Sequence, residues 1–161
     1  MLITIRDAED HDVHLLADLN RFVQDLHVAA LPEYFKHPES GAVAESFRSR
    51  LHRPDVRVWI AHMGDGAVGY AVSVLRERAE NALCLARRFY ELEEIAVSLA
   101  HRRQGVARAL VERVLTEARL QGVPDVELTS WAFNVDAHAA FQALGFWPMI
   151  VRLRHESDAH E

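Results

Sequence analysis

The segment from Phe89 to Trp131 holds a strand, a helix and a second strand in succession, and this order limits the fold more than any other feature. A helix is expected at 105–121, because apolar residues recur there every three or four positions, at Ala107, Leu110, Val111, Val114, Leu115 and Ala118. Gly122 and Pro124 end the helix, and strands are expected at 89–97 and 125–131. Two strands joined by one helix lie parallel, so the sheet must contain a parallel pair.

The rest of the chain adds antiparallel strands and further helices. The hydrophobic patterns and turn residues predict helices at 10–30, 41–51 and 135–144, and strands at 2–6, 56–62, 67–77 and 149–154. The middle strands are consecutive hairpin neighbours and are therefore antiparallel. We expect a mixed α/β fold, with a mostly antiparallel central sheet flanked by about four helices.

Gly64, Gly66 and Gly69 match the pattern G-x-G-x-x-G of dinucleotide-binding folds. That pattern binds a pyrophosphate only where a helix follows it. Residues 70–75 are β-prone and alternate between apolar and polar positions, so the glycines predict a hairpin turn instead.

Composition excludes several classes of protein. The chain has 161 residues, 18 basic and 24 acidic residues and a formal net charge of -6, which disfavours binding to nucleic acid or to an anionic membrane. Its one cysteine, Cys84, cannot form an intrachain disulfide and favours a reducing cytoplasm. No apolar run approaches the ~20 residues of a membrane span, and residues 1–10 do not resemble a signal peptide.

The chain is expected to form one domain over residues 1–155, followed by a polar tail over 156–161. His11 and His14 stand three residues apart among acidic residues, which is typical of a solvated helix start. No spacing matches a four-ligand zinc site, so no metal is expected.

The segment 101–108 is a candidate anion site. It follows a strand directly and opens a helix, whose first N–H groups and partial positive charge attract anions. Arg102, Arg103 and Arg108 add positive charge where the helix dipole disfavours it, and Gly105 and Ala107 are small enough to let a phosphate approach the main chain. An unrelated α/β protein that binds a phosphorylated ligand is left open at this point.

Three motifs in order resemble the GNAT superfamily, the acyl-CoA-dependent N-acetyltransferases. They are Arg102-x-x-Gly105-x-Ala107, the preceding strand 92–97, and Asn134 followed by a short helix that ends in Leu144-Gly145-Phe146. The resemblance is strongest over 89–146. It implies that the fourth and fifth strands splay apart, and that acetyl-CoA binds between them.

The resemblance also implies which residues hold the cofactor. The pyrophosphate would bind the main-chain N–H groups from Arg103 through Gln104, Gly105, Val106 and Ala107 to Arg108, with Arg102 at the entrance. The pantetheine arm would pair with the strand edge at Ile95, Ala96 and Val97, and Asn134 and Phe141 would contact the cofactor from the later motif. The same strand edge would supply an oxyanion hole for the acetyl carbonyl.

For catalysis, Glu93 matches a glutamate that several family members use as a general base. By the two-residue period of a strand, Glu91 is expected on the same face as Glu93 and Glu94 on the opposite face. Many members carry a tyrosine that protonates the leaving thiolate, but this sequence has Phe141 there, so His138, one turn earlier, is the substitute acid.

In this family the first two helices and their connection form the acceptor pocket, which brings in His27 and Tyr34 together with Glu91. The acidic residues favour a small-molecule primary amine, with a cationic amine preferred. A peptide or protein N-terminus, and a non-catalytic domain that binds or senses acyl-CoA, are the alternatives that remain open. A homodimer is also left open, by analogy with such proteins.

Overall fold

The computed structural model describes residues 2–156, in two compact units that divide between Thr129 and Ser130. The first unit holds one sheet in the order β1-β2-β3-β4-β5. Its strands are β1 Ile3–Asp7, β2 Val56–Met63, β3 Gly66–Arg78, β4 Arg87–Val97 and β5 Val126–Leu128. The first three pairings are antiparallel and β4 pairs with β5 in parallel, which confirms the predicted mixed sheet.

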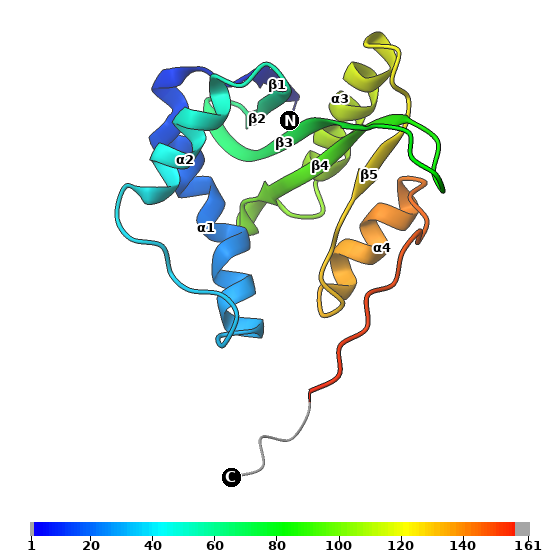
Figure 1. The fold of residues 1–161 in the computed structure, drawn as a ribbon. Helices are drawn as coiled ribbons and strands as arrows, with labels where there is room; N and C mark the ends of the chain where they lie inside the picture. The colour runs from blue at the N-terminus through cyan, green and yellow to red at the C-terminus, as the bar shows by residue number, and fades with distance from the viewer. Residues whose placement is uncertain (1, 157–161) are drawn as a thin grey trace. The chain divides into compact units, whose positions relative to one another are not determined.

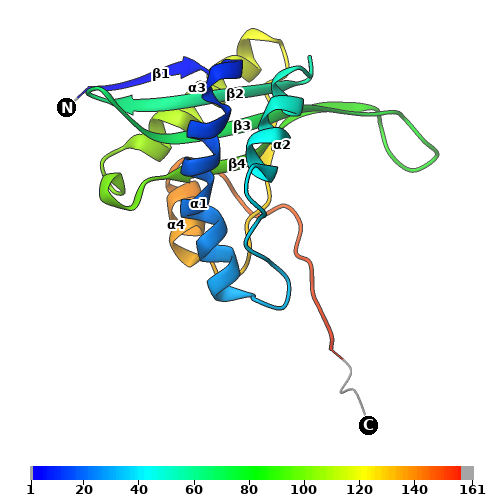
Figure 2. The same ribbon diagram turned by 90° about the vertical axis from the view of Figure 1, so that its left-hand side faces the viewer.

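Helices cover both faces of this sheet (Figures 1 and 2). Helices α1 Val13–Ala30 and α2 Ala42–Leu51 lie on one face, where residues such as Leu16 and Phe47 pack against Tyr70 and Val72 of β3. Helix α3 Val106–Leu120 covers the other face, with Ala118 packed against Tyr90 of β4. The burial of apolar surface on both faces stabilises the sheet.

The start of α1 differs from the prediction. The chain forms a short 3-10 turn, η1 Asp10–Asp12, before α1 begins at Val13. Asp12 stabilises this turn, because its carboxylate accepts a hydrogen bond from the Glu9 N–H at 2.8 Å and two from Arg6, each at 2.7 Å. The Arg6 hydrogen bonds hold the pKa of the Asp12 carboxyl below its usual value.

The glycines at 64–69 form a hairpin, as predicted, since β2 and β3 pair antiparallel across the turn. Gly64 has a positive φ of 60° in this turn. Gly69 has a different role: a Cβ at this position would lie 2.6 Å from the carbonyl oxygen of Ala96. Only glycine therefore allows β3 to approach β4 so closely at this point.

The second unit contains helix α4 Val135–Ala143, as predicted. A second 3-10 turn, η2 Leu99–His101, lies in the first unit between β4 and α3. None of the helices in the described part of the chain is long and apolar enough to cross a membrane.

The predicted strand at 149–154 is wrong, because these residues form neither helix nor strand. Ile150, Val151 and Leu153 are exposed. Alternation in sequence gives a segment two different faces, but a strand exists only where a neighbour satisfies its main-chain hydrogen bonds. The predicted strand at 125–131 is likewise shortened to β5, and most of the predicted polar tail lies outside the described residues.

Candidate functional site

Strand β4 has one open edge at its carboxyl end. It pairs with β3 as far as Val97, but with β5 only over Tyr90–Leu92. From residue 93 to residue 97, this edge therefore has no partner strand in the described parts of the chain. The splayed β4–β5 pair that the family resemblance implied is confirmed.

The direction of the main-chain groups at this edge follows from the pairing. The Ser98 N–H donates to the Val68 carbonyl at 2.8 Å, on the β3 side. Main-chain groups alternate sides along a strand, so those of Ile95 and Val97 point to the open edge, whereas those of Ala96 point to β3. Of the three predicted edge residues, Ile95 and Val97 have donors and acceptors available to a ligand.

The start of α3 presents unpaired main-chain donors close after β4 in sequence. The first hydrogen bond within the helix runs from the Ala109 N–H to the Gly105 carbonyl at 2.9 Å. The N–H groups of Val106, Ala107 and Arg108 consequently have no acceptor inside α3, and no side chain in residues 2–156 caps the helix.

Gly105 gives this helix start its open shape. Its φ of +87° is a left-handed conformation that favours glycine, and a Cβ there would come no closer than 3.7 Å to the Cδ1 atom of Ile3. Arg103 is also left-handed, with a φ of 61°. Arg102, Arg103, Gln104 and Arg108 are exposed. The exposed residues 102–105 and the first turn of α3 thus combine positive charge with free N–H groups, which suits a phosphorylated ligand.

A β-bulge at Glu93 changes the faces of the neighbouring glutamates. Leu92 pairs with Ser73 and Glu94 pairs with Val72, so Glu93 is an extra residue in β4. The extra residue shifts the two-residue alternation by one position. Glu91 and Glu94 therefore lie on the same face, toward α1 and α2, and the prediction that Glu94 lies opposite is wrong.

The Glu94 carboxylate belongs to a hydrogen-bond network between helices and sheet. One oxygen accepts a hydrogen bond from Arg50 of α2 at 2.7 Å, and the other accepts one from the Tyr70 hydroxyl at 2.8 Å. Asn20 of α1 donates to the same hydroxyl at 2.8 Å. Burial, followed by the charge of Glu94, raises the pKa of Tyr70 well above its usual value, so the hydroxyl stays neutral.

The Glu93 carboxylate has weaker interactions than those of Glu91 and Glu94. Its carboxylate lies 3.5 Å from an Arg50 nitrogen and 3.9 Å from an Arg76 nitrogen, neither as a hydrogen bond. Arg76 instead donates to Glu91 at 2.6 Å. Since each of the three carboxylates lies within 4 Å of a guanidinium, the acidic residues no longer give a reason to prefer a cationic acceptor.

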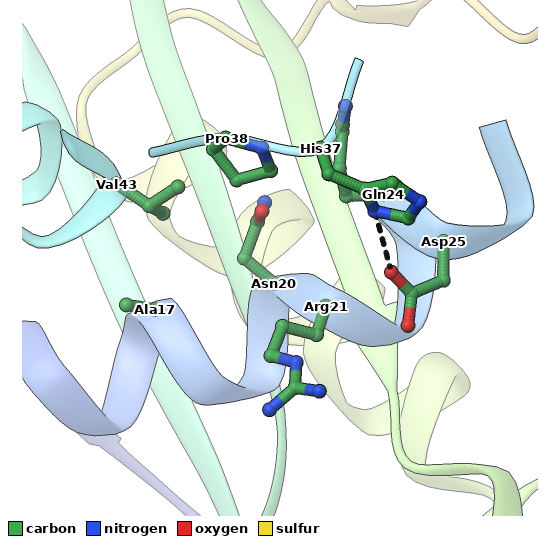
Figure 3. A pocket seen from close by; sticks show the side chains of 8 residues that line it. All are labelled: Ala17, Asn20, Arg21, Gln24, Asp25, His37, Pro38 and Val43. Carbon is green, nitrogen blue, oxygen red and sulfur yellow. Dashed lines mark ion pairs between the residues drawn. The ribbon is translucent and has the colours of Figure 1, made fainter. Parts of the chain in front are cut away.

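Two adjoining pockets lie between α1, α2 and the segment that connects them. The larger, of about 440 Å³, is lined by Ala17, Asn20, Arg21, Gln24, Asp25, His37, Pro38 and Val43. Figure 3 shows side chains of α1 facing His37 and Pro38 across it, with the His37–Asp25 ion pair at 3.6 Å. The second, of about 310 Å³, shares four of these residues and reaches Arg50 and Glu94; we call it the acceptor pocket, after the role proposed for it below.

His27 and Tyr34, which the sequence pointed to as substrate residues, lie near the connecting segment but line neither pocket. The His27 ring stacks on Phe35 at 4.8 Å, and Tyr34 contacts the same ring at 5.3 Å. Burial lowers the pKa of His27, which favours its neutral form. Their part in substrate binding stays a prediction.

Asn134, His138 and Phe141 belong to the second unit. The Asn134 side chain caps α4 by accepting a hydrogen bond from the Ala137 N–H at 3.4 Å. Phe141 packs edge-on against Phe146, with ring centroids 5.8 Å apart, and His138 is half-buried on the same helix. Their predicted roles toward the cofactor and the leaving thiolate stay predictions.

The profile of the acetyltransferase (GNAT) family matches residues 21–146. The chain belongs to this family. Among curated GNAT relatives, the N-acetyltransferase 8B of Rattus norvegicus is 36% identical over 104 residues, which is 65% of this chain and 45% of that protein. The aligned segment therefore spans less than half of the relative's length.

Solved structures share the fold at low sequence identity. A tetramutant of the BH1408 protein from Bacillus halodurans has a TM-score of 0.91 at 19% identity, over 96% of this chain and 99% of that chain. An aminoglycoside acetyltransferase from an uncultured soil metagenomic sample, in complex with sisomicin, has a TM-score of 0.66 at 17% identity, over 97% of both chains. At such identity the likeness concerns the fold alone.

Sequence reasoning did not identify Asn20, Arg50, Tyr70 or Glu94 as site residues. They lie on α1, α2, β3 and β4 respectively, and within its own segment none of them belongs to a recognisable motif. The one available signal was the run of glutamates at 91–94, because a charged run within a buried strand is unusual. The bulge that turns Glu94 toward the helices leaves no sign in the sequence.

Proposed function

We propose that this GNAT protein is an N-acetyltransferase that transfers an acetyl group from acetyl-CoA to a primary amine of a small molecule, by direct attack in a ternary complex. One observation carries the proposal: the open edge of β4 is followed, through a short connection, by a helix start with free N–H groups. Such an arrangement offers main-chain donors both to an acyl-pantetheine arm and to a pyrophosphate.

Acetyl-CoA, when bound, supplies a thioester whose carbonyl carbon an amine can attack. Arg103, Gln104, Gly105, Val106, Ala107 and Arg108 would hold the pyrophosphate, with Arg102 at the entrance. The main-chain groups of Ile95 and Val97 would hold the pantetheine arm and polarise the carbonyl. The fit is supported by the left-handed backbone at Gly105 and by the fact that no side chain among the described residues caps α3.

Glu93 is the proposed general base. The amine must lose a proton to attack the carbonyl carbon, and the carbon–sulfur bond then breaks to release the CoA thiolate. Both oxygens of Glu94 already accept hydrogen bonds. The Glu93 carboxylate, by contrast, accepts no hydrogen bond from Arg50 or Arg76, its two arginine neighbours. Glu93 is therefore the carboxylate with capacity to take the proton.

Phe141 is the observation that favours a second candidate, a domain that binds acyl-CoA without turnover. Phenylalanine has no proton to give to the leaving thiolate. A thiol with a pKa of about 8.5 can nevertheless leave as a thiolate when nearby N–H groups stabilise it, and His138 remains the candidate acid.

A thermal-shift measurement with CoA, acetyl-CoA, ATP and NAD tests the cofactor, and we expect the two CoA species alone to raise the melting temperature. A thiol-release assay over a panel of primary amines then tests turnover. Binding of acetyl-CoA without thiol release on any amine would favour the sensing domain. Stabilisation by ATP or NAD but not by CoA would reject both candidates.

A further inference from the structure

The acceptor pocket is lined by both apolar and charged side chains. Val43 and Phe47 of α2 and Pro38 are its larger apolar residues. Arg50, Glu94 and Lys36 are its charged residues. A pocket of about 310 Å³ can hold a small metabolite, so the nature of its charged groups decides which metabolites fit.

Glu94 is not available to a substrate ammonium group. Arg50 and Tyr70 each occupy one of its oxygens, and Asn20 in turn holds the Tyr70 hydroxyl in place. Tyr70 is fully buried and its hydroxyl stays neutral, so this network keeps its arrangement over the physiological pH range. The carboxylate thus serves to orient Arg50 and Tyr70.

Arg50, by contrast, has an unused donor. Its Nη2 atom is buried and makes no hydrogen bond with any described residue; it forms a long ion pair with a Glu93 oxygen at 3.5 Å. The guanidinium is also held by Glu94 on one side and by the Phe47 ring, whose centroid is 5.4 Å from Cζ. A buried and immobilised guanidinium nitrogen without an acceptor is a site for an oxygen of a ligand.

Lys36 provides a second positive charge at the same pocket. Within the described residues its ammonium group forms no ion pair. Its main chain is tied to α1, because Gln24 donates to the Lys36 carbonyl at 2.8 Å, while its side chain is exposed. Two cations thus border a pocket whose one carboxylate is already neutralised.

We propose that Arg50 and Lys36 form a carboxylate-binding subsite, so that the acceptor is an α-amino acid or a close relative that carries its amine beside a carboxylate. Val43 and Phe47, which line the same pocket, would contact its side chain. This inference rests on the proposed function for the fate of the amine, while the binding of the carboxylate is independent of it.

Matched acceptor pairs test the subsite. Alanine, leucine and phenylalanine are compared with their carboxamides in the thiol-release assay, with KM as the readout, because the amide keeps the amine and side chain but loses the charge. We expect the acid of at least one pair to have a KM about 10- to 100-fold below that of its amide, as for a charge-assisted hydrogen bond. Equal KM values in all three pairs would overturn the proposal.

Variants assign the effect to the two residues. Arg50→Gln and Lys36→Gln should raise the KM of the preferred acid and leave that of its amide little changed. Arg48→Gln serves as the control, because Arg48 is an exposed residue of the same helix and pairs with Glu45. If Arg50→Gln raises both KM values equally, Arg50 is merely structural and the subsite is absent.

Failure of the proposed function can be told apart from failure of this inference. If no amine releases thiol, calorimetry with the same acids and amides, in the presence of CoA, measures binding directly on the full chain. Tighter binding of an acid than of its amide, lost in Arg50→Gln, supports the subsite without any turnover. Absence of that difference overturns it.

Discussion

The two parts of the candidate site use different chemistry. The start of α3 and the open edge of β4 offer main-chain N–H and C=O groups, whereas the acceptor pocket is lined by side chains from α1, the segment between α1 and α2, α2 and β4. Main-chain groups are present whatever the residue type, so the first part depends on backbone conformation. The second part depends on each polar side chain, since a single substitution leaves a buried partner without its hydrogen bond.

The largest effect is expected from Gly105→Glu, which tests the backbone part. A side chain at a φ of +87° is strained, and its carboxylate would repel a phosphate at the helix start. We expect the Kd for acetyl-CoA to rise by about 100-fold or more, measured by calorimetry.

Gly122→Glu is the matched control for that change. Gly122 also has a positive φ, of +69°, with open space around it, but it follows the other end of α3. The control should share the backbone strain and keep its affinity for acetyl-CoA. Equal affinity in both variants would show that the start of α3 is not the cofactor site.

Glu93→Gln tests the link between the two parts, since Glu93 lies in the stretch of β4 without a β5 partner and 3.5 Å from Arg50, which lines the acceptor pocket. We expect kcat to fall by about 100-fold or more, with loss of its pH dependence, while the Kd for acetyl-CoA stays the same. Glu77→Gln, at an exposed glutamate paired with Arg88, should have no effect. An unchanged pH profile in Glu93→Gln would assign the base to another residue.

The smallest change, Tyr70→Phe, removes one hydroxyl from the side-chain part. Glu94 and Asn20 would each lose a hydrogen-bond partner, so we expect the free energy of unfolding to fall by about 1–3 kcal/mol at neutral pH. Urea unfolding measures this difference.

The same variant has a defined pH dependence. The pKa of Tyr70 is raised above its usual value of 10.0, so above that pH the folded state binds a proton that the unfolded state has lost. The wild-type protein should therefore lose its advantage over Tyr70→Phe by about 1.4 kcal/mol per pH unit as the pH rises past about 10. A constant difference from pH 8 to pH 12 would contradict a neutral, buried Tyr70.

Local patterns predicted most of the first unit. The apolar repeat of α3, the glycine turn before β3 and the strand–helix–strand order were sufficient, because each depends on residues close together in sequence. The strand expected at 149–154 failed because pairing needs a partner that alternation does not supply. The start of α1 was displaced because Arg6 and Asp12 form their ion pair across the end of β1 and the following turn.

The candidate site divides in the same way. The sequence predicted the helix start at Gly105 from element order and small residues, and its motifs indicated the family, whose resemblance implied the open edge of β4. Only the tertiary structure decided that Glu94 joins Glu91 on one face and that Arg50, Tyr70 and Asn20 meet it there. The reason is physical. One extra residue in β4 moves the side chains that follow it to the opposite face of the sheet, and contacts between distant segments form only when the helices pack on the sheet.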